Sequence, residues 1–160
     1  MRGDKRGFAT GIHHHPEWEL VSAATTGLRF QKFGDGLPQE FVCSAVPEQS
    51  HEAGYLVHVV AESCIRRERG LAYGSGYLND GPLIPETEIV GALAMPHPLA
   101  EQGFDVLRDA DGEATLKFMT LMPVTEDEFR FIQAEGPQEM VATWSREDVD
   151  VFDFYRDSAV

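Results

Sequence analysis

The order of local signals in the last third of the chain constrains the fold more than any other feature. Residues 115–122 alternate apolar side chains on both faces, which predicts a central strand covered on both sides. Pro123 follows, and Thr125-Glu-Asp-Glu128 forms a capping box that begins a short helix. Gly136-Pro137 ends that helix and begins another, on which Met140, Val141 and Trp144 are expected to point inward. An extended segment, 149–155, is expected to close the chain.

The remaining elements predict an α+β fold with a mainly antiparallel sheet flanked by helices. Strands are expected near 18–30, 40–46 and 88–95, and a hairpin is expected to join 104–108 to 115–122. A helix beginning at Ser50 carries an apolar face at helical spacing, made of Ala53, Leu56, Val57, Val60 and Cys64. Its last turn and exit hold Arg66, Arg67 and Arg69, which suit the helix dipole and are not interpreted as a binding patch. Gly70 is expected to form the left-handed exit of the helix.

Composition indicates one domain of ordinary size with an uneven negative charge. The 160 residues are 42% apolar and carry a formal charge of −14. Residues 1–85 hold 8 basic and 10 acidic side chains, whereas residues 86–160 hold 5 and 17. Such an acidic half argues against nucleic acid or an anionic membrane as partner and favours a basic protein partner. A role in solubility alone would explain the same asymmetry.

The chain ends and cysteines predict the organisation and compartment of the protein. Residues 1–15 are expected to form a flexible arm, and residues 16–160 the domain. No segment has the apolar length of a signal peptide or a membrane span. Cys43 and Cys64 lie among apolar residues, which predicts buried free thiols in a reducing, cytoplasmic location.

His13-His-His15 is the sequence feature closest to a metal-binding motif. Alternate residues of a strand share a face, so only His13 and His15 could converge on an ion. A small metal-dependent hydrolase using these two histidines is therefore one hypothesis. Neither a cysteine nor a helical histidine pair at ligand spacing completes the site, so we predict no metal, no cofactor and no catalytic residue.

An acidic series near the C-terminus is the candidate partner-binding site. Asp148, Asp150, Asp153 and Asp157 alternate with apolar residues. The series is consistent with an edge strand protected by charge, or with an acidic docking strip for a basic partner.

Several segments, in order, resemble the suppressor-of-fused (SUFU-like) domain. The segments are Trp18–Leu28 with its Thr-Gly-Leu ending, Leu37–Val42 with a glutamate before apolar residues, the helix from Ser50, Gly81-Pro-Leu83, Leu121–Glu128 and Asp153–Ser158. The resemblance covers roughly residues 16–158 and implies a protein-binding module with no associated enzymatic chemistry. The length of the chain matches one lobe, as in compact bacterial relatives.

The resemblance leads to a hypothesis of function. Many compact relatives are proposed immunity proteins, so we expect a non-enzymatic protein that neutralises a toxin by occlusion, with a basic toxin domain as partner. A structural or regulatory scaffold is the alternative, beside the metal hydrolase. Within the acidic tail, Arg156 is expected to anchor the chain by bidentate pairing with a carboxylate.

Overall fold

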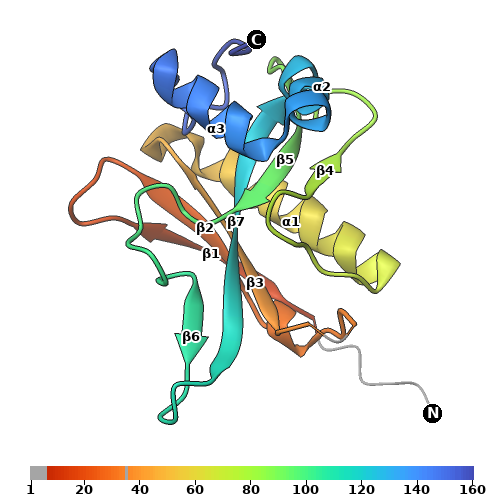
Figure 1. The fold of residues 1–160 in the computed structure, drawn as a ribbon, viewed down its shortest axis with the longest axis vertical. Coiled ribbons are helices and arrows are strands. Elements are labelled where there is room, and N and C mark those ends of the chain that lie inside the picture. The colour runs from red at the N-terminus through yellow and green to blue at the C-terminus, as the bar shows by residue number, and fades with distance from the viewer. Residues whose placement is uncertain (1–6, 35) are drawn as a thin grey trace.

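A seven-stranded sheet organises residues 7–34 and 36–160, which are the residues described by this computed structural model (Figure 1). The main strand order is β1-β2-β3-β7-β5-β4, and β6 also pairs with β7. Only the β3–β7 pair is parallel among the strands of the described residues. The strands are β1 (Ala9–His14), β2 (Val21–Thr26), β3 (Gln39–Ala45), β4 (Gly76–Leu78), β5 (Ile89–Met95), β6 (Val106–Arg108) and β7 (Ala114–Thr125). The predicted α+β class with a mainly antiparallel sheet is confirmed.

Helix α1 (Ser50–Arg67) covers one face of the sheet. Its predicted apolar face is buried, and it packs on inward residues of β2, β3 and β7, including Ala23, Phe41 and Met119. Short 3-10 helices, η1 (Leu28–Phe30) and η2 (Pro47–Gln49), precede β3 and α1. The main core therefore lies between α1 and the sheet.

Among the described residues, helices cover the opposite face of the sheet at one end only. Helices α2 (Glu126–Glu135) and α3 (Pro137–Arg146) lie together there (Figure 1) and pack on Leu93, Met122 and Val124. Met140 and Trp144 supply the helical side of this second core. Towards β1, β2 and β6, the same face of the sheet is left uncovered by these helices.

The long strand β7 connects the part of the sheet formed by β1, β2 and β3 to the part formed by β4 and β5. It pairs with β3, β5 and β6, and its residues from 119 to 125 are all buried. The burial predicted for 115–122 is therefore confirmed from Met119 onward, whereas Thr115 is exposed and Lys117 and Phe118 are half-buried. The hairpin with β6 and the capping box at Thr125 and Glu128 are also confirmed.

Three local predictions were wrong. Ala9–His14 form strand β1, paired with β2, so the expected flexible arm does not extend over them; residues 1–6 lie outside the described residues. The segment 149–155 consists of turns rather than an extended strand, because Asp150 and Asp153 cap local backbone amides. Val141 is exposed, since it lies one residue from the buried Met140 on the helix.

The ends of α1 also differ from expectation. Ser50 makes no capping bond, because η2 leads directly into the helix and Gln49 occupies the N-cap position. The left-handed exit residue is Glu68, with φ of 51°, instead of Gly70.

Candidate functional site

A groove of about 1050 Å³ occupies the uncovered half of the sheet. Its floor consists of outward residues of β2, β3 and β7, namely Ser22, Val42, Phe118 and Thr120. These positions alternate with the core residues that face α1, so the period of two along each strand builds the core and the groove together. The walls come from the β1–β2 loop and the segment 97–107.

Large apolar side chains on both walls remain in contact with solvent. Trp18 is 38% exposed on one wall, and Leu99, Phe104 and Leu107 are 43%, 77% and 54% exposed on the other. An uncovered concave surface with several such side chains is typical of a binding site. The arrangement therefore favours contact with an apolar ligand or partner segment.

The charged groups along the groove all have one sign. Glu17, Glu101 and Asp105 line it, and no lysine or arginine does so within the part of the chain that is described. In a protein with a net charge of −14, this surface should attract positive charge.

Two histidines and two serines form a hydrogen-bonded chain across the floor of the groove. His15 Nε2 lies 2.8 Å from Ser22 Oγ, Ser22 Oγ lies 2.6 Å from Ser44 Oγ, and Ser44 Oγ lies 2.9 Å from His97 Nε2. Burial, together with the nearby His15, lowers the pKa of His97 below its ordinary value of 6.5. The chain joins the two walls, because His15 follows β1 and His97 begins the opposite wall.

His13 and His15 both line the groove. His15 is occupied by its bond to Ser22, however. Over residues 7–34 and 36–160, no group of three or more His, Cys, Asp or Glu side chains is arranged to hold a metal ion. The same residues include no helix long and apolar enough to span a bilayer.

The predicted acidic site residues do not form a strand. Asp148, Asp150 and Asp157 are exposed, whereas Asp153 accepts a hydrogen bond from Gln49 Nε2 at 2.6 Å and one from the Tyr155 amide. The segment adjoins the groove, because the Phe152 ring stacks on His97 with 6.1 Å between centroids.

The expected anchoring of Arg156 is confirmed, and its partner is Glu128. Arg156 Nη1 and Nη2 donate to Glu128 Oε1 and Oε2 at 2.7 and 2.9 Å. Trp144 Nε1 and the amides of Thr125 and Ala159 also donate to this carboxylate, which is fully buried. Burial alone would raise the pKa of Glu128, but these donors and the arginine charge lower it below its usual value.

A second buried carboxylate holds the entrance to β3. Glu40 is 2% exposed and accepts bonds from Thr25 Oγ1 and from the amides of Gly27, Leu28 and Arg29. Gly27 is in the left-handed region, with φ of 99°, which a side chain would strain. Glu40 and Glu128 therefore stabilise the fold, and neither is available as a binding residue. The groove is the candidate site.

The wall segment 97–107 was not identified as a site from the sequence. Phe104 was expected within the hairpin, but β6 begins only at Val106, so Phe104 lies outside the paired strand. Apolar residues in a segment without helical or strand periodicity, such as Leu99 and Phe104, were the signal available.

The fold and the groove define a class: an α+β domain whose sheet is covered by helices on one face and half-covered on the other. The chain belongs to the Suppressor of fused protein (SUFU) family, whose sequence pattern matches residues 10–157. None of the curated proteins matches the chain.

Solved structures share this fold. A SUFU homologue from Neisseria gonorrhoeae is 19% identical with a TM-score of 0.65, and the match covers 96% of this chain and 78% of the homologue. Sufu from the Sufu–Fu complex is 11% identical with a TM-score of 0.68, with coverage of 95% and 76%. Suppressor of Fused from Drosophila is 10% identical with a TM-score of 0.67; the match covers 95% of this chain but 42% of that protein.

Proposed function

We propose that this protein is a non-enzymatic protein-binding module whose groove receives an apolar, positively charged segment of another protein. The observation that carries the proposal is the groove itself, with exposed Trp18, Leu99 and Phe104 on its walls and, among the described residues, only carboxylates as its charged side chains. Apolar contact would supply affinity, and the acidic rim would select and steer a basic partner. The similar Sufu in the Sufu–Fu complex, a protein assembly, supports a binding role.

The acidic segment beside the groove extends the proposed surface. Asp148, Asp150 and Asp157 are exposed there, and the Phe152–His97 stack connects the segment to the groove wall. A basic partner seated in the groove would meet these charges at its edge. Asp153 contributes less to binding in this proposal, because Gln49 and the Tyr155 amide already bond its carboxylate.

The finer proposal is that the partner is a toxin and that this protein is its immunity protein. The net charge of −14 suits occlusion of a basic toxin domain. We place the complex in the cytoplasm, where the two buried cysteines, Cys43 and Cys64, would remain reduced.

Co-expression tests this proposal. The products of the genes adjacent to the one for this chain are expressed one at a time in a bacterial host, with and without this protein. A neighbour that stops growth alone, and is neutralised when this protein is present, supports the immunity role. A neighbour that is toxic but equally toxic in its presence contradicts it.

The binding surface is tested on the same pair. Phe104→Ser should abolish neutralisation, and the matched change Tyr55→Ser, at a 46% exposed aromatic on α1, should not. Reversing Asp148 and Asp150 to lysine should slow association, and added salt should slow the wild type in the same way, because screening shortens the range of surface charges. Indifference to both changes would exclude the acidic segment as a docking surface.

A further inference from the structure

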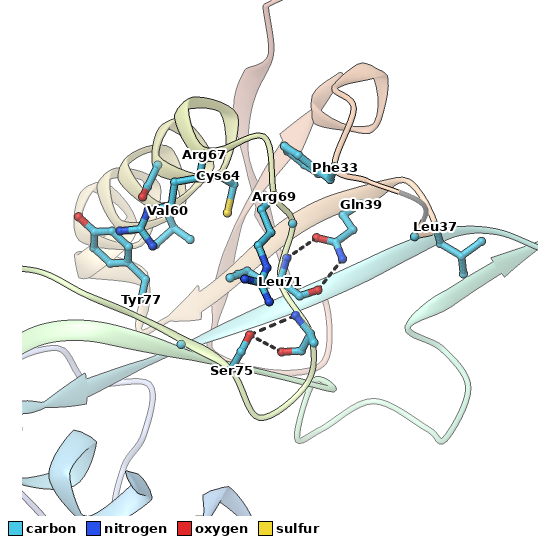
Figure 2. A pocket seen from close by; sticks show the side chains of 15 residues that line it. Phe33, Leu37, Gln39, Val60, Cys64, Arg67, Arg69, Leu71, Ser75 and Tyr77 are labelled. Atoms are coloured by element: carbon cyan, nitrogen blue, oxygen red, sulfur yellow. Dashed lines mark hydrogen bonds between the residues drawn. The ribbon is translucent and has the colours of Figure 1, made fainter.

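A second pocket, of about 490 Å³, lies at the C-terminal end of α1. It is on the side of the sheet that α1 covers, whereas the groove is on the opposite side. Figure 2 shows it between the last turns of α1, the segment carrying Arg69, Leu71 and Ser75, and the start of β3 at Gln39. Apolar walls come from Phe33, Leu37, Val60, Leu71 and Tyr77. The pocket thus combines a small volume with apolar walls that include two aromatic rings.

The charges of this pocket are opposite to those of the whole protein. Arg67 and Arg69 line it, and no aspartate or glutamate does so among the described residues. The chain holds 27 acidic and 13 basic residues, so carboxylates are expected to outnumber arginines and lysines in an average pocket of this protein. This pocket has the opposite charge.

The side chains of these two arginines have no hydrogen bond or ion pair with another described residue; the backbone amide of Arg69 donates to the Cys64 carbonyl at 3.1 Å. Their neighbour Arg66, in contrast, lies within 4.0 Å of Glu62. Arg29, Arg130, Arg146 and Arg156 also pair with carboxylates. The guanidinium groups of Arg67 and Arg69 therefore remain available to a ligand, and such groups bind carboxylates and phosphates with paired hydrogen bonds. The favourable interaction of positive charge with the C-terminal end of the α1 dipole explains why arginines occur at this end of the helix. It does not explain why two of them line a pocket.

The wall opposite the arginines is fixed by the fold. Gln39 bonds Leu71 twice, from Nε2 to the Leu71 carbonyl at 2.6 Å and from the Leu71 amide to Oε1 at 2.9 Å. Gly70 permits this approach, because a Cβ there would lie 2.6 Å from Gln39 Oε1. A wall held by such bonds costs little to order on binding.

We propose that this pocket binds a small organic anion, whose oxyanion contacts Arg67 and Arg69 and whose apolar body packs between Leu71 and Tyr77. The ligand chemistry is an oxyanion, phosphate or carboxylate, joined to a flat apolar group. This site is separate from the groove and does not depend on the protein-binding role.

Titration of the protein with phenyl phosphate, benzoate and inorganic phosphate, followed by backbone amide NMR, tests the proposal. At least one organic probe should shift the amides of Leu71 and Ser75 at concentrations up to about 10 mM. The tighter of the two organic probes identifies the oxyanion. Inorganic phosphate should bind more weakly, because it lacks the apolar body.

Variants assign the contact. Arg67→Gln with Arg69→Gln should weaken the best probe by about tenfold or more, since charge-assisted hydrogen bonds are lost. Arg66→Gln, the matched neighbour outside the pocket, should change its affinity less than about twofold. The proposal would be overturned if no probe shifted the amides, or if the double variant bound the best probe as tightly as the wild type. It would also be overturned if Arg66→Gln lost as much affinity as the double variant, or if inorganic phosphate bound as tightly as the organic probes. The side chains of Arg67 and Arg69 have no partner among the described residues, and Arg66 has only an exposed one, so circular dichroism should show both variants folded.

Discussion

Replacing Arg156 by alanine should destabilise the protein strongly at pH 7. The change removes both bonds to Glu128 and the bond from Arg156 Nη2 to the Pro123 carbonyl at 3.0 Å. Glu128 stays fully buried, and the Trp144 indole and two backbone amides are left to hold its charge. Breaking a buried pair in this way costs about 3–5 kcal/mol in the free energy of unfolding. For a chain of this size the melting temperature should fall by roughly 10 °C.

Chemical denaturation of the wild type and two variants measures this cost. Arg146→Ala is the matched control: its side chain is 59% exposed and lies near Glu139 and Glu147, so it should cost less than about 1 kcal/mol. The wild-type pairing lowers the Glu128 pKa, so its stabilisation is present above the usual value of 4.5 and is lost as the pH falls through the folded-state pKa. A loss in Arg156→Ala no larger than in the control would refute the reasoning.

Trp144→Ala should lower the free energy of unfolding by about 3–5 kcal/mol, because the side chain is 95% buried and donates to Glu128; a loss below about 1 kcal/mol in denaturation would place α3 wrongly. The pKa of His97 is lowered in the fold, so the unfolded state takes up a proton at a higher pH than the folded state, and the free energy of unfolding should fall as the pH drops below 6.5. His97→Gln should remove this pH dependence of stability, and an unchanged pH dependence in the variant would contradict the prediction. Replacing the exposed His13 and His14 by alanine should leave the melting temperature within a few degrees of the wild-type value. Adding His15→Ala should lower the free energy of unfolding by about a further 1 kcal/mol, because the bond to Ser22 is lost. A large loss of stability in the double variant would contradict the prediction and show that His13 and His14 support the fold.

The motifs that resemble the family predicted the fold because they are the residues that hold it. The Thr25–Leu28 turn and Glu40 are bonded to each other, and the capping box at Thr125–Glu128 is bonded to Arg156. Each motif joins two distant segments, so its sequence pattern is local while its contact is long-range. The bidentate anchoring of Arg156 was predictable from its chemistry, but the choice of Glu128 among 27 acidic residues was not.

The sites were less predictable than the fold. The groove consists of the outward residues of three strands and a loop, and only the sheet order brings Ser22, Val42 and Thr120 together. Charge counting along the chain identified an acidic half, yet did not show that Arg67 and Arg69 share a pocket without carboxylates. The turns at 149–155 were mistaken for a strand, because aspartates that cap local amides give the same alternation as an edge strand.

Site-directed photo-crosslinking in the producing cells tests the central claim, partner binding at the groove, most directly. A benzophenone amino acid is placed at Phe104 on the groove wall, and in a second variant at Tyr55 on α1; both positions are exposed. The account predicts a crosslinked protein at Phe104 that is absent at Tyr55, that is basic, and that is lost when Trp18 is replaced by serine. An adduct at Tyr55 alone, equal adducts at both positions, or none at Phe104 would contradict the claim.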